Sequence, residues 1–253
     1  MIAGPRVHRN VLDPAMLVRL ESWVSEVQGW PVGSHAWGHY AERAGTATVV
    51  CRTENVSACH PGVAHLVDGV LAEVAAGERG EAMTAFKDKI NYKQPGGAGF
   101  SPHQDVLAYP GARTVVSLLV AVDACTVSSG CVWIATGVDR LLPTDGRGVV
   151  TADACAALRW EPAELAPGDA LCIDGLAPHR SDANHTARPR RVLVASYAPR
   201  AEGYGREQYY DARRRHMRAA STRDGRDRIS TLADFDGTMV HPASAVESGC
   251  THG

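Results

Sequence analysis

The sequence lacks the features that would assign it to several common protein classes. Its 253 residues carry a formal net charge of -2, so there is no excess of positive charge to attract nucleic acid or an anionic membrane. No window approaches the roughly 18 uninterrupted apolar residues of a membrane-spanning helix. The opening residues, Met1 to His8, have no apolar segment typical of a secretion signal. We therefore expect no nucleic-acid partner and no membrane partner.

The cysteines also lack an organised pattern. There are seven, scattered along the chain, and no two form a C-x-x-C pair. An odd, dispersed set argues against a zinc ribbon and against a secreted disulfide framework. Most lie in apolar surroundings, where a free thiol behaves as a small hydrophobic side chain. The sequence therefore predicts a reduced, cytoplasmic protein.

What the sequence does contain is a change of hydrophobic period near residue 82. Before it, Asp13-Pro14 starts an amphipathic helix over residues 14–28, and Pro61 starts a second helix that ends at the turn 77–80. After it, short apolar runs are separated by turn residues, as in a barrel or sandwich of strands. These runs are 87–94, 113–123, 130–135, 170–174 and 191–198.

These patterns predict a mostly β protein with flanking helices. We expect one domain over residues 1–253, with N-terminal helices at 13–80 packed on a β core at 82–200. An outer helix is predicted over 204–220, followed by a loosely held tail over 221–253. The sequence shows neither an internal repeat nor a linker between domains.

A His-x-Asp pair, His103 and Asp105, follows a glycine-rich turn. In an extended segment, residues i and i+2 point to the same face, so an imidazole nitrogen and a carboxylate oxygen can converge on one metal ion. A second histidine, His179, ends the apolar run that starts at the turn 167–169. Two imidazoles and one carboxylate with open positions are typical of non-haem Fe(II) oxygenases. These three residues are therefore predicted to form a catalytic iron site.

An arginine run, formed by Arg188, Arg190 and Arg191, opens the next predicted strand. A guanidinium beside a metal site can bind a carboxylate in a bidentate manner. A solvated strand edge would show the same run of charge. Because an iron site is predicted nearby, we interpret Arg190 as an anchor for a carboxylate.

Taken together, these segments resemble the phytanoyl-CoA dioxygenase family over about residues 85–200. The resemblance is carried by Asn91-Tyr92-Lys93, the His-x-Asp pair, Gly130-Cys131, the turn 167–169, His179-x-Ser181-x-x-Asn184 and Arg190-Arg191. Residues 90–93 are also similar to ectoine hydroxylase, and residues 91–105 to bacterial dioxygenases of small aminoalkylphosphonates. The resemblance implies a double-stranded β-helix (jelly-roll, cupin-like) core and a reaction that uses Fe(II), 2-oxoglutarate and O2.

The resemblance also implies roles for residues around the iron. Arg190 would pair with the distal carboxylate of 2-oxoglutarate, and Asn91 and Ser181 would add hydrogen bonds to that co-substrate. Related halogenases replace the carboxylate ligand with a small residue, whereas this chain retains Asp105. Hydroxylation, with release of succinate and CO2, is therefore the expected reaction.

For the substrate, the resemblance points to Tyr109 as a facing aromatic residue, with Lys93 and Gln104 as further pocket residues. The expected substrate is a small soluble zwitterion or anion, such as an aminoalkylphosphonate, or else a natural-product intermediate. An apolar shell is expected to limit water around the iron. Its predicted members are Val115, Leu118, Trp133 and Ile173.

Two other interpretations stay open at this point. A cupin-like metal enzyme without 2-oxoglutarate would keep the three ligands and be indifferent to Arg190. A non-catalytic jelly-roll binding protein would keep only the shape. A third, phosphatase chemistry at Asp234-Phe-Asp-Gly-Thr238, is rejected because the 15 residues after Thr238 (253 - 238) cannot supply the large domain that it requires.

Overall fold

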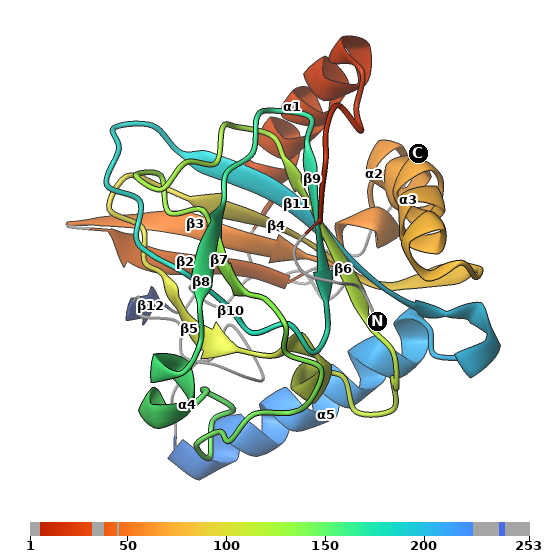
Figure 1. Cartoon of the computed structure of the whole chain (residues 1–253). Coiled ribbons are helices and arrows are strands. Elements are labelled where there is room, and N and C mark those ends of the chain that lie inside the picture. The colour runs from red at the N-terminus through yellow and green to blue at the C-terminus, as the bar shows by residue number, and fades with distance from the viewer. Residues whose placement is uncertain (1–5, 32–37, 45, 225–237, 241–253) are drawn as a thin grey trace.

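Two antiparallel β-sheets pack face to face in the computed structural model (Figure 1). The structure describes residues 6–31, 38–44, 46–224 and 238–240. For residues 216–224 and 238–240 only the backbone is described. Within these residues the larger sheet has the order β1 (Arg6–His8), β9 (Ala170–Asp174), β6 (Val116–Ala121), β11 (Arg190–Pro199), β4 (Met83–Lys93), β3 (Ala47–Glu54), β2 (Gly38–Ala44) and β12 (Thr238–Val240). The smaller sheet has the order β5 (Phe100–His103), β10 (His179–Ser181), β7 (Val132–Ala135) and β8 (Trp160–Ala163).

Helices cover the outer face of the larger sheet and one end of the molecule. Figure 1 shows α2 and α3 on one side of that sheet and the smaller sheet on the other. None of the helices in the described ranges is long and apolar enough to cross a membrane. The helices are α1 (Pro14–Gln28), α2 (Pro61–Asp68), α3 (Val70–Arg79), α4 (Ala152–Ala156) and α5 (Arg206–Asp224), with short 3-10 turns η1 (Val56–Ala58), η2 (Asp105–Ala108) and η3 (Arg200–Glu202).

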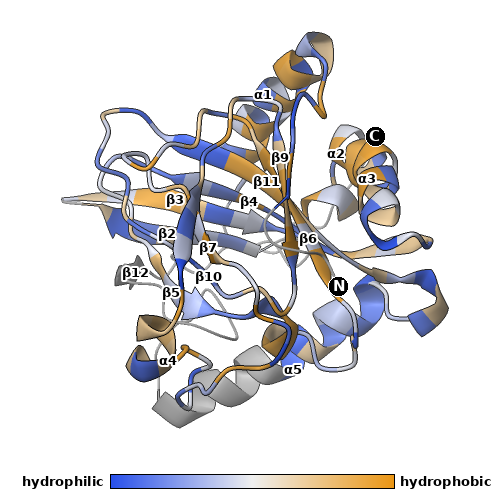
Figure 2. Ribbon diagram, viewed as in Figure 1, coloured by the Kyte–Doolittle hydropathy of each residue, from blue (hydrophilic) through white to orange (hydrophobic). Residues whose placement is uncertain are grey.

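Strand alternation divides the core into two layers. On β11, Leu193 and Ala195 pack under the helices, whereas Val192 and Val194 pack against the smaller sheet. β6 and β9 are mostly hydrophobic because both of their faces are buried, with Ser117 in β6 and Asp174 at the end of β9 as the polar residues (Figure 2). The same alternation turns the side chain of Arg190 toward the space between the sheets. That space contains the functional site.

The predicted first helix is confirmed, and the second is corrected. The Asp13 side chain accepts a hydrogen bond from Met16 N at 2.7 Å, and Pro14 is the first helical residue, as predicted. The predicted helix after Pro61 is two helices, because Gly69 has φ -102° and ψ -108°, which is not helical. A Cβ at this position would lie 2.6 Å from the His65 carbonyl oxygen, so the break depends on glycine.

The predicted runs of the β core appear as β4, β6, β7, β9 and β11, whereas β1 and β2 were not predicted. Part of the predicted tail is ordered, because β12 pairs with β2. Residues 234–237 of the rejected phosphatase motif lie outside the described residues. The mostly β architecture with flanking helices is confirmed, while the single-domain boundaries remain a prediction.

Candidate metal centre and co-substrate cavity

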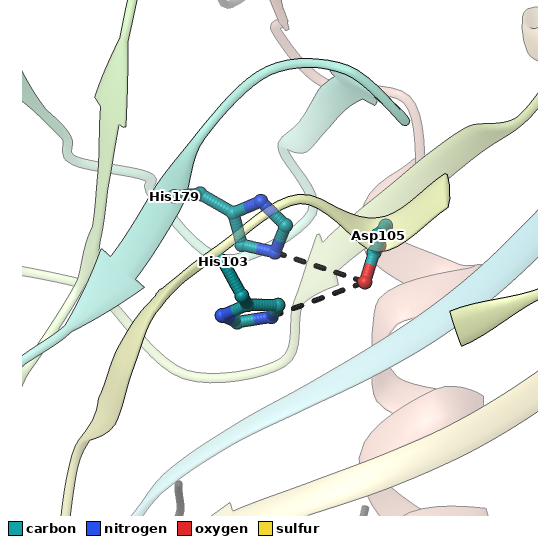
Figure 3. Close-up of side chains that lie close together, drawn as sticks. All are labelled: His103, Asp105 and His179. Carbon is teal, nitrogen blue, oxygen red and sulfur yellow. Dashed lines mark ion pairs between the residues drawn. The ribbon is translucent and has the colours of Figure 1, made fainter. Parts of the chain in front are cut away.

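Three side chains from two strands and a turn meet between the sheets. His103 ends β5 and His179 starts β10, and the two residues are partners in the antiparallel register. Their ring centroids lie 4.2 Å apart. Asp105 opens η2, and its Oδ1 lies 3.9 Å from Nε2 of each histidine (Figure 3). One ligand atom from each residue thus falls within 4.8 Å of the others, as a single metal ion requires.

Backbone carbonyls fix which nitrogen of each histidine faces the metal position. Nδ1 of His103 lies 2.7 Å from the Ser101 carbonyl oxygen, and Nδ1 of His179 lies 3.0 Å from the Ala177 carbonyl oxygen. A carbonyl only accepts, so each Nδ1 carries the proton and each Nε2 keeps its lone pair for a metal. Burial, together with the charge of His179, lowers the pKa of His103 to about 3, so this imidazole is neutral near pH 7.

The carboxylate ligand is held in its ionised form. Burial raises the pKa of Asp105, but His179, His103 and the nearby lysines outweigh this effect, and the net shift is downward. Ser117 Oγ donates to Asp105 Oδ2 at 3.0 Å and shares a 2.9 Å hydrogen bond with Ser196 Oγ. The serine pair therefore fixes the orientation of the carboxylate, with Oδ1 toward the histidines.

We expect Ser117→Ala to weaken Fe(II) binding about tenfold to a hundredfold, because loss of a hydrogen bond to a metal ligand has costs of this order. An anaerobic Fe(II) titration of the purified protein measures the change. Ser196→Ala is the matched control, since it removes the partner of Ser117 and leaves the donor to Asp105 in place. Equal losses in both variants would contradict this role of Ser117.

A buried basic pair forms one wall of the cavity beside the three ligands. Arg190 and Lys93 are register partners on β11 and β4, with only 4% and 6% of their surface exposed. Both donate to the Gly130 carbonyl oxygen, at 2.7 Å from Arg190 Nη2 and 3.2 Å from Lys93 Nζ. Gly130 has φ +71°, and a Cβ there would lie 2.4 Å from the Asp182 carbonyl oxygen, so only glycine fits.

The guanidinium of Arg190 has unmet hydrogen-bonding capacity. Its Nε is buried and has no acceptor among the described residues, and none of their carboxylates forms an ion pair with it. Burial also lowers the pKa of Arg190, because the charged guanidinium is removed from water. Because an unpaired buried cation is costly, this wall fits an added carboxylate such as that of 2-oxoglutarate.

Two more of the predicted co-substrate residues line the same cavity. Ser181 lies two residues after His179 on β10 and accepts a hydrogen bond from Lys93 Nζ at 2.9 Å. Asn91 lies two residues before Lys93 on β4, and its Oδ1 accepts from Arg52 Nε at 3.0 Å. Lys93, predicted as a pocket residue, is therefore held at the co-substrate wall.

The structure places Gln104 and Tyr109 behind the cavity wall, not on it. The amide of Gln104 donates to the carbonyl oxygens of Arg140 (2.9 Å) and Leu176 (2.6 Å) and accepts from Leu142 N (2.8 Å). Both of its N–H donors are therefore in use and its side chain is fully buried, so it links two loops and does not face a substrate. Tyr109 is buried among aromatic side chains, and its hydroxyl accepts from Lys87 Nζ at 3.0 Å. Tyr109 therefore contacts the cavity only indirectly, by holding the side chain of Lys87, which lines it.

The predicted apolar shell is corrected in the same way. Of its four members only Ile173 lines the cavity, where it is joined by Leu119, Val132 and Val194. Leu118 points to the opposite layer and packs under the helices. The reason is that neighbouring residues of a strand face opposite sides of the sheet.

The sequence placed Lys89 and Lys93 near the mouth of the barrel, but it missed Lys87 and Arg52 on the remaining wall. Lys87, Lys89, Asn91 and Lys93 follow one another at every second position of β4 and all line the cavity. This i, i+2 spacing was a usable signal. Arg52 was not recoverable in this way, because it lies on β3 and reaches the cavity by pairing with Asn91.

A buried ion network connects this wall to α5. Glu54 accepts from Arg52 Nη1 at 3.2 Å and from Arg213 Nη2 at 2.8 Å. Burial raises the pKa of Glu54, but Arg213 and Arg52 outweigh burial and lower it overall. The carboxylate is therefore ionised and fixes the guanidinium of Arg52 against the cavity. Helix α5 thus supports the site as well as covering one end of the molecule.

The cavity has an empty volume of about 980 Å³, counted out to its open mouth. Two imidazoles and one carboxylate present three donor atoms on one side of it, and the buried Arg190–Lys93 wall fits a dicarboxylate. This donor set is the 2-His-1-carboxylate triad of non-haem Fe(II) oxygenases. The fold and the site together define an Fe(II)- and 2-oxoglutarate-dependent dioxygenase.

Comparison with known proteins gives the family. The model for phytanoyl-CoA dioxygenase (PhyH) matches residues 3–192. The chain is 37% identical to the methylphosphonate hydroxylase of Gimesia maris over 230 residues, which are 89% of this chain and 88% of that protein. It is 32% identical to the 2-aminoethylphosphonate dioxygenase of uncultured bacterium HF130_AEPn_1 over 231 residues, 87% of each chain. The protein belongs to the phytanoyl-CoA dioxygenase family, as the sequence resemblance indicated.

Solved structures confirm the double-stranded β-helix fold. EctD from S. alaskensis, solved with 2-oxoglutarate and 5-hydroxyectoine, has a TM-score of 0.69 at 20% identity, covering 79% of this chain and 74% of that one. The non-haem alpha-ketoglutarate-dependent epimerase SnoN from nogalamycin biosynthesis has a TM-score of 0.64 at 20% identity, covering 78% and 79%. At these identities the likeness establishes the fold.

Proposed function

We propose that this enzyme hydroxylates a C–H bond of a small phosphonate, using O2 and 2-oxoglutarate and releasing succinate and CO2. The observation that carries the proposal is a cluster of three cations, Arg52, Lys87 and Lys89, which line the same cavity as the iron ligands. The two relatives named for phosphonate substrates support it. An iron site alone would not require this charge.

Burial and mutual repulsion disfavour the charged forms of the two lysines in the cluster. Burial lowers the pKa of Lys87 to about 8. It lowers the pKa of Lys89 further, with Arg52 and Lys87 adding repulsion. Within the described residues the Lys89 ammonium has no hydrogen-bond acceptor. A doubly charged phosphonate would relieve the repulsion and accept from all three cations.

Each wall then has a task in the reaction. His103, Asp105 and His179 would hold Fe(II) on one face, and the bound metal supplies the activation of O2. Arg190 and Lys93 would bind the far carboxylate of 2-oxoglutarate, which leaves its 2-oxo acid end directed to the metal. The cation cluster would orient the phosphonate so that one C–H bond faces the same position. Apolar side chains that line the cavity would exclude water from the reaction. They are Leu119, Val132, Ile173 and Val194.

The test is to load the protein anaerobically with Fe(II) and 2-oxoglutarate, record the visible charge-transfer band, and then admit O2 with a candidate substrate. We expect the band to form, and succinate to be released when methylphosphonate or 2-aminoethylphosphonate is present. Absence of the band would contradict the iron and 2-oxoglutarate site. A band without phosphonate-dependent succinate would contradict the substrate class.

Substrate affinity should decline as pH rises through the pKa of Lys87, which is about 8. Below that pH the ammonium is charged and attracts the phosphonate, and above it the neutral amine does not. The KM for the phosphonate, measured on both sides of this pKa, should therefore rise on the alkaline side. Lys87→Arg keeps its charge at these pH values and should flatten that rise. An unchanged profile in Lys87→Arg would assign the titration to another group.

We also propose that the protein resides in the cytoplasm. Each cysteine in the described part of the chain is a free thiol, which fits a reducing compartment. Cys250 lies outside the described residues. Fractionation of the native host, with detection by an antibody against the protein, measures the location directly.

A further inference from the structure

We propose that Glu42 binds the ammonium group of a zwitterionic substrate, so that the enzyme acts on aminoalkylphosphonates in preference to alkylphosphonates that lack an amino group. This inference rests on the proposed function and specifies the second end of the substrate. Glu42 lies on β2 and lines the cavity that holds the iron ligands. Only 2% of its surface is exposed.

The Glu42 carboxylate has capacity left for a cation. Its Oε2 accepts one long hydrogen bond, from Ala98 N at 3.3 Å, and no described residue donates to its Oε1. None of the described lysines and arginines forms an ion pair with it. The other carboxylate that lines the cavity, Asp105, is committed to the metal. Glu42 is thus the available acidic group among the described lining residues.

The nearest candidate partner within the chain is already occupied. Burial raises the pKa of Glu42, and the hydrogen bond from Ala98 N and the charge of Lys93 oppose this effect without outweighing it. The ammonium of Lys93 donates, however, to Ser181 Oγ, the Gly130 carbonyl oxygen and the Asp182 carbonyl oxygen. All three of its N–H donors are therefore in use. A buried carboxylate left in this state is stabilised when a ligand brings a cation.

The position of Glu42 relative to the cation cluster suits a short zwitterion. Strand β2 neighbours β3, where Tyr40 is the partner of Arg52 and Glu42 is the partner of Val49. The Cα atoms of Glu42 and Arg52 are therefore separated by on the order of 10 Å, from the strand rise and spacing. Both side chains extend into the cavity and shorten the gap between their charges. A phosphonate and an ammonium joined by one or two carbons would span it.

The structural alternative is that Glu42 only holds the turn at Ala98. Glu42→Gln separates the two roles, because glutamine keeps a carbonyl oxygen that accepts from Ala98 N and loses only the charge. The matched control is Glu164→Gln. Glu164 also accepts one backbone N–H, from Val127 at 3.0 Å, but it is exposed and does not line the cavity.

The experiment compares 2-aminoethylphosphonate with ethylphosphonate, its analogue without the amino group. Binding to the anaerobic protein loaded with Fe(II) and 2-oxoglutarate is measured by calorimetry, and succinate release gives kcat/KM. We expect the wild type and Glu164→Gln to prefer the amino compound. Glu42→Gln should bind that compound about tenfold to a hundredfold more weakly, as for loss of a charged hydrogen bond, with ethylphosphonate nearly unaffected.

Other outcomes overturn the inference in distinguishable ways. A wild type that prefers ethylphosphonate, or a preference that survives in Glu42→Gln, shows that Glu42 does not bind the ammonium, while the proposed function stands. If neither phosphonate binds or promotes succinate release, the proposed function itself is wrong. The wild-type comparison needs no variant, so a wild type without preference for the amino compound overturns the inference even if Glu42→Gln does not fold.

Discussion

His179→Ala is expected to remove bound Fe(II) and to reduce 2-oxoglutarate turnover by more than about a hundredfold. Losing only a hydrogen-bond partner of a metal ligand costs up to about a hundredfold, and losing the ligand itself should cost more. The variant leaves one imidazole and one carboxylate, which cannot close the three-donor face that His103, Asp105 and His179 form together. Metal content after anaerobic reconstitution and succinate release with substrate are the two measurements.

The control for this experiment is His185→Ala. His185 is exposed, and its backbone N–H, not its ring, bonds the Ser128 carbonyl oxygen. Its replacement should leave iron content and turnover unchanged. If His179→Ala retained a full complement of iron and its activity, the metal site would have to lie elsewhere in the chain.

Arg190→Ala should raise the KM for 2-oxoglutarate strongly, because it removes the buried cation predicted to pair with the distal carboxylate. Breaking a buried charged pair costs about 2 to 5 kcal/mol, which corresponds to roughly 30-fold to a few thousand-fold in affinity. Calorimetric titration of 2-oxoglutarate into the anaerobic Fe(II) protein measures the loss directly. Iron content should stay close to the wild-type value, because Arg190 is not one of the three predicted ligands.

The adjacent arginine offers a close control. Arg191 points to the other side of β11 and pairs with Asp123, at 2.7 Å from Nε and 2.8 Å from Nη2. Arg191→Ala should therefore lower stability modestly and leave 2-oxoglutarate affinity intact. If both variants bound 2-oxoglutarate as the wild type does, the co-substrate site would be misplaced, and the alternative of a cupin-like enzyme without 2-oxoglutarate would gain support.

The proposed co-substrate wall and the proposed ammonium site lie on different strands of the larger sheet. The Arg190–Lys93 wall is built from paired central strands, with both side chains hydrogen-bonded to the backbone at Gly130. Glu42 lies instead on β2, near the far edge of the sheet. We expect a change of Glu42 to alter recognition of the substrate without disturbing the strands that carry the predicted metal ligands.

The sequence by itself determined the features that depend on local geometry. The cap and proline at Asp13-Pro14 specify α1, and the i, i+2 spacing brings His103 and Asp105 toward one metal position. The assignment of His179 as the third ligand was a long-range inference, because 76 residues (179 - 103) separate it from His103. The structure brings His179 together with His103 and Asp105, in the chemically distinctive donor set on which the prediction was based.

Only the tertiary structure decided which side chains face one another across strands. His179 lies opposite His103, and Arg52 opposite Asn91, because of strand register, which has no local signature. In a strand buried on both faces, such as Val116–Ala121, every residue is apolar or small, so the sequence carries no alternation from which to assign a face. Leu118 was therefore assigned to the wrong layer, and the unpaired carboxylate of Glu42 became visible only in the folded chain.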